Sequence, residues 1–597
     1  MPVRLLLKLI LFIAVFPFAI SAQKPAVQFQ LGFDSATQHR LSIHMDFQVK
    51  NEGDYTDLVM PRWMPGYYQL MDYPENVSAF AAMDKDGKPL RWEKADVNTW
   101  RVYKTGKPVI TVTYSVLATR NFVANPLVDS AHAFLAPPGI YLHEENQLQQ
   151  PVAVHVLMPA GWKHIATGLD QDAAGKLIAP DYDVLYDSPV LLGNLDSFPV
   201  FTVKGIPHYF MAYQPGATNG AALMKDLKKI VEKATDMMGV IPYKKYVFLG
   251  IGAGRGGIEH LNSAAVGFTG DGYNTEAGRQ QLLSFLAHEY FHHYNAKRIR
   301  PIELGPFDYN QENRTRLLWV AEGITSYYDE LLLCRAGLTR PEQLVESLRH
   351  SLQAYESGPG RLFQSVSQAS YDTWSDGPFG RTGDVVNKTI SFYDKGPVLG
   401  WMLDWRIRHM TQNKRSLDDV MRLLYHRYYE KGRGYTEAEF RSGCEEIAGR
   451  DLSDFFAYVY TVETPNYPRY LGYGGLLIDT SWQKQPGGWL GFSGAEKNDT
   501  LRVTHISTAS PAWKAGLLPG TAVLRINDQR ASTALLQSLL MTATEKQIIQ
   551  LDTWHKGQLK RLSMQVATGK IQPFTISKNQ QASNLAKQIF TSWASGK

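Results

Sequence analysis

The sequence predicts a multidomain α+β protein, because the residue pattern changes twice along its 597 residues. From about residue 27 to 203, polar and apolar residues alternate in short runs broken by Gly and Pro, which is typical of strands. From about 207 to 467, apolar residues recur at helical spacing. From about 473 to 567, short strands with glycine turns return. We therefore expect a β-rich N-terminal domain, a mainly helical middle domain and a third domain that is again β-rich.

Residues 1–22 have the pattern of a secretory signal peptide. Arg4 and Lys8 precede an apolar run, and the small residues Ser21 and Ala22 follow it. The run is short for a membrane span and contains a proline, and no later run is long enough to cross a membrane. We expect an exported, periplasmic mature protein without a membrane span; a retained N-terminal anchor is the alternative.

The composition narrows the class of protein. With 44% hydrophobic residues, the chain can bury several cores. A formal charge of +5 is small for this length and no basic run stands out, so we expect no nucleic-acid partner. The two cysteines, Cys334 and Cys444, exclude a disulfide framework and a cysteine metal site, and whether they pair is left open.

The same patterns give the domain boundaries. We expect the β-rich domain over residues 23–205, with strands at Leu41–Val49 and Val109–Val116. The helical domain should span residues 206–470. Its helices are expected near 283–294, 317–336, 341–355, 397–410, 417–430 and 436–449.

The first of these helices contains an H-E-x-x-H motif, His288-Glu289-Tyr290-Phe291-His292. Helical spacing puts His288 and His292 one turn apart on one face, where two imidazoles can hold one metal ion. Glu289 can then reach a water at the metal without binding the ion itself, which is the arrangement of a zinc peptidase base. A polar helix face with incidental histidines is the alternative interpretation.

Two histidines do not complete a zinc site, and a catalytic zinc keeps its fourth position for water. Four carboxylates downstream are candidates for the third ligand: Glu303, Asp308, Glu312 and Glu322. The first three lie among prolines and glycines, which indicates a loop. We choose Glu322, because the helical run 317–330 can present it beside the first helix. An ordinary exposed glutamate is the alternative.

These motifs resemble a known family. The segments His288–Pro301, Trp319–Tyr328 and Trp63–Tyr68 are similar to the glycyl aminopeptidase family of zinc metallopeptidases, family sixty-one of the gluzincin clan. The resemblance covers most of the mature chain. It implies a β-rich N-terminal domain, a thermolysin-like catalytic domain and a C-terminal PDZ domain. It also implies one Zn2+ per chain and removal of N-terminal residues from peptides, with glycine or alanine preferred.

A second motif concerns the substrate's amine. Gly256-Gly257-Ile258-Glu259-His260 follows a strand-like run and resembles the edge-strand motif that lines the substrate cleft of aminopeptidases. There Glu259 would pair with the α-ammonium group of the substrate and fix the first residue against the metal. For His260, a substrate contact and an ordinary hydrogen bond remain equal alternatives. The glycine-rich stretch is not a phosphate loop, because the Lys-Ser/Thr ending is absent.

A third motif, Ser391–Gly396, resembles the tyrosine motif of related aminopeptidases, in which a phenol binds the oxyanion of the tetrahedral intermediate. We assign this role to Tyr393, because a phenol beside zinc would stabilise the developing charge. A buried structural tyrosine is the alternative.

The sequence differs from the clan at the position of a residue that usually orients a histidine ligand. Four residues after Glu322, in place of an aspartate that orients a ligand histidine, the chain has Ser326. Asn295, one turn after His292, is a candidate substitute, and a surface asparagine is the alternative.

The third region, residues 471–570, resembles a PDZ domain. Its glycine-containing loop at Leu490, Gly491 and Phe492 is similar to a carboxylate-binding loop, so a peptide C-terminus is a candidate ligand that would add a strand to a sheet edge. Residues 571–597 are polar, and we expect a frayed tail there.

The sequence thus predicts a periplasmic zinc aminopeptidase that acts on peptides with a free N-terminus. Two alternatives remain. One is a PDZ-type peptide-binding protein with a weak or inactive peptidase site, although Glu289 is intact and an inactive site has no reason to keep its base. The other is a zinc endopeptidase, which would also cleave N-acetylated peptides.

Overall fold

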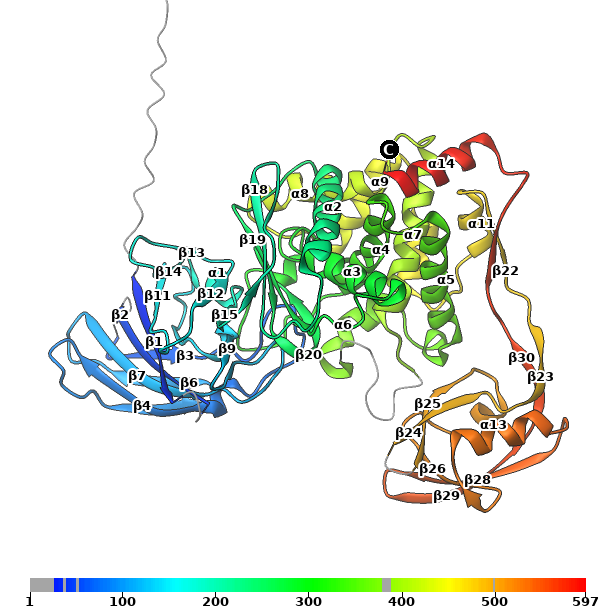
Figure 1. Ribbon diagram of the computed structural model, residues 1–597, viewed down its shortest axis with the longest axis horizontal. Coiled ribbons are helices and arrows are strands. Elements are labelled where there is room, and N and C mark those ends of the chain that lie inside the picture. The colour runs from blue at the N-terminus through cyan, green and yellow to red at the C-terminus, as the bar shows by residue number, and fades with distance from the viewer. Residues whose placement is uncertain (1–25, 36–38, 50–52, 378–387, 498–499, 597) are drawn as a thin grey trace, which may run out of the picture.

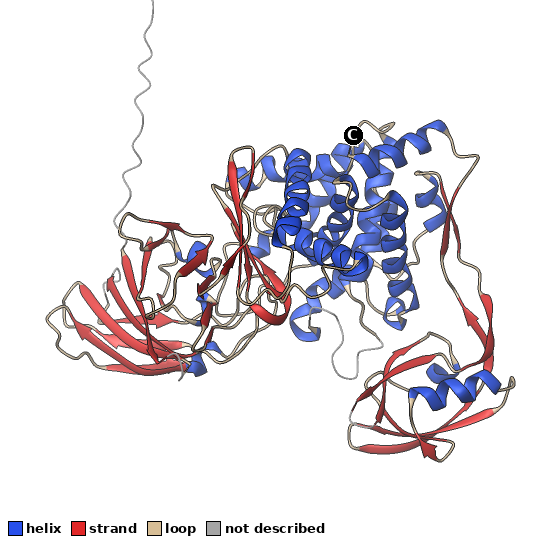
Figure 2. Ribbon diagram, viewed as in Figure 1, coloured by secondary structure: helices blue, strands red, loops and turns tan. Residues whose placement is uncertain are grey.

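The computed structural model describes residues 26–35, 39–49, 53–377, 388–497 and 500–596, so the predicted signal peptide lies outside the described residues. A β-rich domain, a helical domain and a second β-rich domain follow one another along the chain (Figure 1). Figure 2 shows that the last domain is set apart at the end of a pair of long strands. The predicted α+β organisation with a β-rich N-terminal domain is confirmed.

Alternating burial builds the N-terminal domain. Its strands are β1 (Val27–Ser35), β2 (Arg40–Gln48), β3 (Tyr55–Val59), β4 (Val77–Asp84), β5 (Trp92–Asp96), β6 (Thr99–Tyr103), β7 (Val109–Leu117), β8 (Leu127–Val128), β9 (His132–Leu135), β10 (His143–Glu144), β11 (Val152–Val156), β12 (His164–Thr167), β13 (Asp170–Gln171), β14 (Leu177–Ala179) and β15 (Val190–Gly193). Every second side chain of β2 and β7 is buried, as the alternating sequence predicts. One apolar core therefore lies under the large sheet.

Three sheets share these strands. The largest has the order β13-β14-β11-β1-β2-β7-β4, and the two smaller ones have the orders β10-β3-β6-β5 and β12-β15-β9-β8. Short helical turns connect them, η2 (Tyr73–Asn76), η3 (Pro137–Gly139) and α1 (Tyr182–Tyr186). The residue that ends α1, Asp187, lies next to the helical domain, as its contacts below show.

A mixed sheet forms one side of the helical domain. Its strands are β16 (Asp196–Ser197), β17 (Phe201–Val203), β18 (Ile206–Ala212), β19 (Tyr246–Gly250), β20 (Gly252–Glu259) and β21 (Ser263–Phe268). The order β16-β18-β19-β21-β20 makes β20 an edge strand, and its pairing with β21 shifts register between Gly252 and Gly257. An edge strand leaves backbone groups unpaired, so β20 can receive a further strand.

Helices fill the rest of this domain. They are α2 (Gly220–Met238), α3 (Glu276–Phe291), η4 (Ile302–Leu304), η5 (Trp319–Ile324), α4 (Thr325–Arg335), α5 (Pro341–Ser357), η6 (Pro359–Leu362), α6 (Val366–Asp376), α7 (Phe392–Met410), α8 (Leu417–Arg427), η8 (Tyr429–Lys431), α9 (Glu437–Ala448), α10 (Ser453–Tyr460) and α11 (Tyr467–Gly472). The predicted helices are present. However, α7 begins at Phe392 rather than at residue 397, because Ser391 caps it, and Tyr393 is therefore in the first turn.

The C-terminal domain contains a six-stranded sheet. The remaining strands of the chain are β22 (Leu476–Asp479), β23 (Gln483–Trp489), β24 (Phe492–Lys497), β25 (Thr500–Ile506), β26 (Ala522–Ile526), β27 (Gln529–Arg530), β28 (Ile548–His555), β29 (Gln558–Gln565), β30 (Ala567–Ile571) and β31 (Thr575–Lys578). The domain sheet has the order β24-β25-β26-β28-β29, with β27 beside β26 and with helices α12 (Pro511–Lys514) and α13 (Thr533–Thr542). The pairs β22–β31 and β23–β30 connect it to the helical domain.

The last segment differs from the frayed tail that we expected. Helix α14 (Asn584–Ser595) packs back onto the helical domain, and Ile589 and Trp593 are fully buried. The Trp593 indole donates a hydrogen bond of 2.7 Å to the Tyr327 hydroxyl. Our expectation rested on the polar composition of the whole segment. It overlooked an amphipathic pattern, in which apolar side chains three or four residues apart form one face of a helix.

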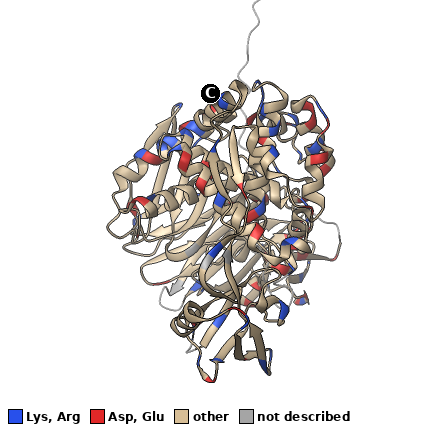
Figure 3. Ribbon diagram, turned by 90° about the vertical axis from the view of Figure 1, so that its right-hand side faces the viewer, with Lys and Arg blue, Asp and Glu red and all other residues tan. Residues whose placement is uncertain are grey.

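Charged residues of both signs are spread over the molecule. In the view of Figure 3, Lys and Arg residues are interspersed with Asp and Glu, in line with the small net charge of +5. Cys334 and Cys444 are both buried and free. Within the part of the chain that the structure describes, no helix combines the length and the apolar character that a membrane crossing requires.

Candidate active site

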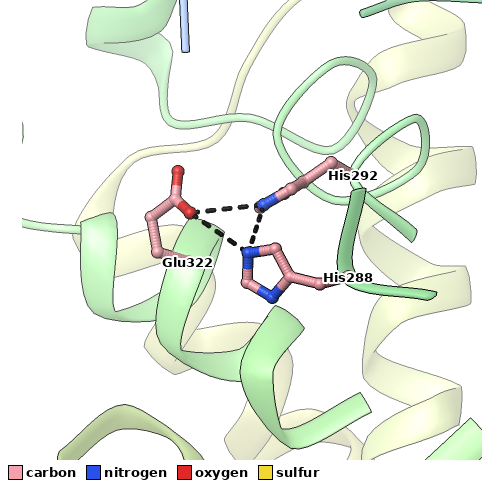
Figure 4. Close-up of side chains that lie close together, drawn as sticks. All are labelled: His288, His292 and Glu322. Carbon is pink, nitrogen blue, oxygen red and sulfur yellow. Dashed lines mark hydrogen bonds and ion pairs between the residues drawn. The ribbon is translucent and has the colours of Figure 1, made fainter. Parts of the chain in front are cut away.

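Helix α3 presents the two histidines of the motif. Thr275 caps the helix by accepting a hydrogen bond from the Gly278 amide, and His292 stands at the C-terminal end. His288 Nε2 and His292 Nε2 lie 2.9 Å apart, as the one-turn spacing predicts. Both imidazoles point toward the Glu322 carboxylate (Figure 4).

Glu322 approaches the histidines from η5, a π-helical turn that continues into α4. Its Oε2 lies 3.2 Å from His292 Nε2 and 3.7 Å from His288 Nε2. Among the described residues, this is the one group of three or more His, Cys, Asp or Glu side chains close enough to share a metal ion, with all ligand atoms within 4.8 Å. Sites of this kind often interrupt regular helices with a π turn.

The other three carboxylates that we weighed have different partners. Glu303 accepts a hydrogen bond from Thr315. Asp308 accepts one from Gln311, and Glu312 pairs with Arg314. All three lie in the segment between the two helices, Glu303 in the short turn η4 and the other two in loop, where the prolines and glycines indicated irregular structure.

The outer nitrogen of each histidine is already bonded. His288 Nδ1 donates to Asp329 Oδ2 at 3.0 Å, and His292 Nδ1 donates to the Asn295 carbonyl at 2.8 Å. These bonds fix the hydrogen on Nδ1, so both Nε2 lone pairs face Glu322. The partner of His288 is thus Asp329, and not the candidate substitute Asn295. Ser326, which stands where related enzymes carry an aspartate, has its Oγ 3.5 Å from His288 Nδ1.

This donor set fits a zinc ion. A tetrahedral zinc with bonds of about 2.0–2.2 Å holds its ligand atoms about 3.3–3.6 Å apart. The three atoms here lie 2.9, 3.2 and 3.7 Å apart. Burial tends to raise the pKa of Glu322, but His292 and His288 lower that pKa well below its ordinary value, so the carboxylate is ionised and ready to bind a cation.

Glu289 is buried beside this cluster, at 5% exposure. Burial raises the pKa of Glu289 to about 7, against the lowering effect of the two histidines. Its Oε2 has no hydrogen-bond partner among the described residues. Gly257 of the edge strand β20 packs against its carboxyl group, where any Cβ would collide with it. The carboxylate is therefore held in place with one oxygen open to a further partner.

Two phenols donate to Glu322, one on each oxygen. Tyr393 bonds Oε2 at 3.0 Å, the oxygen that faces the histidines, and Tyr68 bonds Oε1 at 2.9 Å. Close contact between two glycines permits the first bond, since a Cβ on Gly323 would lie 2.6 Å from Gly396 Cα of α7. Burial raises the pKa of Tyr393 well above its ordinary value, so the hydroxyl keeps its proton and remains a donor. Tyr393 thus lies beside the metal cluster.

Glu259 ends strand β20 and is buried at 5% exposure. Lys297 Nζ lies 3.6 Å from its Oε1. On another side, a Cβ built on Gly66 would lie 2.9 Å from Oε2, so the N-terminal domain borders this carboxylate directly. His260 is fully buried, and its Nδ1 lies 3.0 Å from Asp187 Oδ1. His260 Nδ1 therefore has the hydrogen bond that we gave as one alternative, and contact of His260 with substrate stays a prediction.

Several site residues escaped the sequence analysis: Asp329, Tyr68, Gly66, Asp187 and Lys297. Asp329 had a usable signal, because a residue seven positions after Glu322 falls on the same helix face. Gly66 and Tyr68 lie in the segment that carries the family resemblance, but no local pattern tells which side chain reaches the site. Asp187 and Lys297 meet only through the tertiary fold.

The predicted peptide-binding loop lies in the C-terminal domain. Leu490 is buried, and Gly491 has a φ of +77°, a conformation that favours glycine. The Gly491 carbonyl accepts a hydrogen bond of 2.7 Å from the Ser507 amide. Phe492 begins β24, an edge strand of the sheet.

Two segments match models of one peptidase family. Residues 28–194 match the Peptidase M61 N-terminal domain, and residues 281–399 match M61 glycyl aminopeptidase. The second match contains His288, His292, Glu322 and Tyr393. These matches define the class of the protein, which is a peptidase. Within that class, the two matched segments are similar to domains of the M61 glycyl aminopeptidases. A comparison with curated proteins finds no match.

A solved structure shares the fold. The crystal structure of an aminopeptidase N family protein from Idiomarina loihiensis has a TM-score of 0.85 and 24% identity, and the alignment covers 95% of this chain and 100% of that one. An M1 zinc metallopeptidase from Deinococcus radiodurans has a TM-score of 0.47 and 13% identity, over 74% of this chain and 95% of that one. The first comparison shows that the fold extends over nearly the whole chain.

Proposed function

We propose that the protein is a zinc aminopeptidase that hydrolyses the first peptide bond of peptides with a free N-terminus, with glycine or alanine preferred. One observation carries this proposal: two Nε2 lone pairs and a carboxylate oxygen converge beside the buried Glu289. Both histidines are fixed in the tautomer that binds a metal, which an incidental cluster would not require.

His288, His292 and Glu322 would hold one Zn2+ per chain. Zinc in such a site supplies Lewis acidity to a carbonyl oxygen and lowers the pKa of water. Glu289 takes the proton of the attacking water and delivers it to the leaving amine, a role that suits a carboxyl group with a pKa of about 7. Tyr393 donates its hydroxyl hydrogen to the oxyanion.

The aminopeptidase assignment rests on Glu259. This buried carboxylate at the end of the cleft-edge strand is a suitable partner for the α-ammonium group, and pairing there would fix the first residue of the peptide. An endopeptidase has no need of a buried carboxylate at that position. The pattern of residues 1–22 supports export to the periplasm, and a mature protein that begins at Gln23 would establish it.

We further infer that the C-terminal domain is a PDZ domain that takes a peptide C-terminus. Strand β24 has an open edge, and the Leu490–Gly491 turn leads into it. A peptide that adds to this edge would place its carboxylate near that turn.

The replacement Glu289→Gln tests the catalytic proposal. The amide keeps the shape of the side chain but cannot accept a proton, so kcat for glycyl and alanyl amides should fall about 10²- to 10⁴-fold. Zinc content should stay near one ion per chain, because Glu289 is not among the three ligands. Turnover close to that of the unmodified enzyme would rule out the mechanism.

Glu330→Gln is a matched control. Glu330 is a neighbouring glutamate whose pKa is also raised to about 7 by burial, but its Oε1 accepts a hydrogen bond from Ser284 and takes no part in the cluster. Its replacement should leave kcat unchanged. Equal cleavage of N-acetylated and free peptides by the unmodified enzyme would favour the endopeptidase alternative.

A further inference from the structure

A buried group of charges lies behind Glu259 and joins two domains. Asp187 of the N-terminal domain accepts a hydrogen bond of 2.9 Å from Lys297 Nζ, and Lys297 Nζ lies 3.6 Å from Glu259 Oε1. The three residues are 5–8% exposed. Buried charges at such close range are paired or serve a function, because burying an unpaired charge is costly.

Asp187 also holds the chain directly after Glu259. Its Oδ2 accepts a hydrogen bond of 2.8 Å from the Leu261 amide, and its Oδ1 lies 3.0 Å from His260 Nδ1. One carboxylate therefore bonds both residues that follow Glu259, as well as Lys297. Asp187 fixes the end of strand β20, and Lys297 fixes the carboxylate that this end carries.

Lys297 keeps its charge in this group. Burial lowers the pKa of Lys297, but Asp187 and Glu259 raise it further, so the ammonium group keeps its proton. The ammonium group lies between the Asp187 and Glu259 carboxylates, 2.9 Å from Asp187 Oδ1 and 3.6 Å from Glu259 Oε1. Lys297 therefore ties the Glu259 side chain to the residue that fixes the end of strand β20.

We propose that Asp187 and Lys297 are positioning residues for Glu259, which they hold in place to pair with the α-ammonium group of the substrate. This inference rests on the proposed aminopeptidase function. The site requires both domains, because Asp187 comes from the N-terminal domain and Gly66 of that domain borders the Glu259 carboxylate.

The test replaces Lys297 by methionine, which keeps the length of the side chain and removes its charge. Two substrates are compared, a glycyl amide and its desamino analogue, in which hydrogen replaces the amine. For the unmodified enzyme, kcat/KM should be much higher with the amine. In Lys297→Met this preference should shrink about 10- to 100-fold, because Glu259 loses its fixed position, whereas cleavage of the analogue should change little.

Two measurements and two further variants make the outcome decisive. Zinc content and the thermal unfolding midpoint show whether the variant is intact; if it is not, Asp187→Asn, which keeps the shape, should give the same loss of preference. Lys245→Met is the control, since Lys245 Nζ also bonds the N-terminal domain, at Leu169 O over 2.6 Å, but it does not contact Glu259. Its amine preference should equal that of the unmodified enzyme.

The possible failures point to different proposals. An equal fall for both substrates in zinc-loaded Lys297→Met, or an unchanged preference, would overturn the positioning role and leave the aminopeptidase function standing. An unmodified enzyme that cleaves both substrates equally well would instead overturn the aminopeptidase function itself.

Discussion

The N-terminal and C-terminal domains meet the catalytic domain in different ways. The N-terminal domain reaches the metal cluster through buried contacts, since the Tyr68 hydroxyl bonds Glu322 at 2.9 Å and Gly66 borders Glu259. The C-terminal domain is joined by paired strands, and Trp513 stacks on the half-exposed Phe363 with ring centroids 6.3 Å apart. The first domain contributes residues to the candidate active site, whereas the second is attached to the catalytic domain through its connecting strands.

The loop between His292 and Glu322 explains how the N-terminal domain comes so close. Trp63 Nε1 donates to the Asp308 carbonyl at 2.8 Å, and the Tyr309 hydroxyl donates to Asp183 at 2.8 Å. The sequence indicated a loop here, and the structure shows that it binds the N-terminal domain. The segment between His292 and Glu322, two of the proposed metal ligands, is therefore also an interdomain contact.

Gly66→Ala should have the largest effect among the changes that test this comparison. The φ of +99° at Gly66 is strained for alanine, and the new Cβ would press on the Glu259 carboxylate. A displacement of the substrate anchor should lower kcat/KM for glycyl amides about 100-fold. Gly175→Ala, at a φ of +78° with open space around the position, carries the backbone strain alone and should keep full activity. Equal activities of the two variants would show that the N-terminal domain does not shape the amine site.

Tyr68→Phe should have a smaller effect, because it removes one hydrogen bond from a ligand carboxylate. Zinc affinity, measured by competition with a chelator, should fall about 10-fold, as is typical when the outer partner of a ligand is lost. Tyr73→Phe is the matched control, since the buried Tyr73 hydroxyl donates to the Ala124 carbonyl, away from the cluster. Unchanged zinc affinity in Tyr68→Phe would show that the hydrogen bond from Tyr68 to Glu322 does not contribute to metal binding and that the N-terminal domain only packs there.

Local rules predicted the residues that share a helix or a motif. His288 and His292 follow from the one-turn spacing, and Glu322 follows from its place in a helical run rather than in the loop. The strands of the N-terminal domain follow from alternation, which the burial of β7 reproduces. These features depend on neighbours in sequence, so a single sequence contains the necessary information.

Features that depend on distant contacts could not be predicted in this way. Lys297 and Asp187 are 110 positions apart, and Tyr68 and Glu322 are 254 positions apart. Neither pair leaves a periodic signal. The contact of Tyr393 with Glu322 depends on the close approach of η5 and α7, which the contact between Gly323 and Gly396 permits. In the sequence, a single glycine in a helix indicates only a lower helix propensity, so it does not predict this contact.

The smallest effect concerns the C-terminal domain. A peptide with an apolar C-terminus and a free carboxylate should bind to this domain. The same peptide with an amidated C-terminus should not bind, because it lacks the negative charge that the backbone N–H groups of the loop recognise. Fluorescence anisotropy of the labelled peptides would measure both. Saturation with the free-carboxylate peptide should change kcat/KM for a glycyl amide by less than about twofold, since surface contacts of this kind transmit little energy.

A larger change in kcat/KM would mean that the C-terminal domain, like the N-terminal domain, influences the candidate active site. A cavity of about 520 Å³ lies between the catalytic and C-terminal domains, lined by Ser391 and Asp394 on one side and by Thr504 and His505 on the other. Two residues of its wall, Ser391 and Asp394, flank Tyr393 in sequence, and we expect a long substrate that extends past the site to reach this cavity. A short glycyl amide does not reach that far, and its turnover should therefore be insensitive to the bound peptide. If the bound peptide slows the cleavage of long peptides but not of the amide, the C-terminal domain acts on substrate access and not on the chemistry of the site.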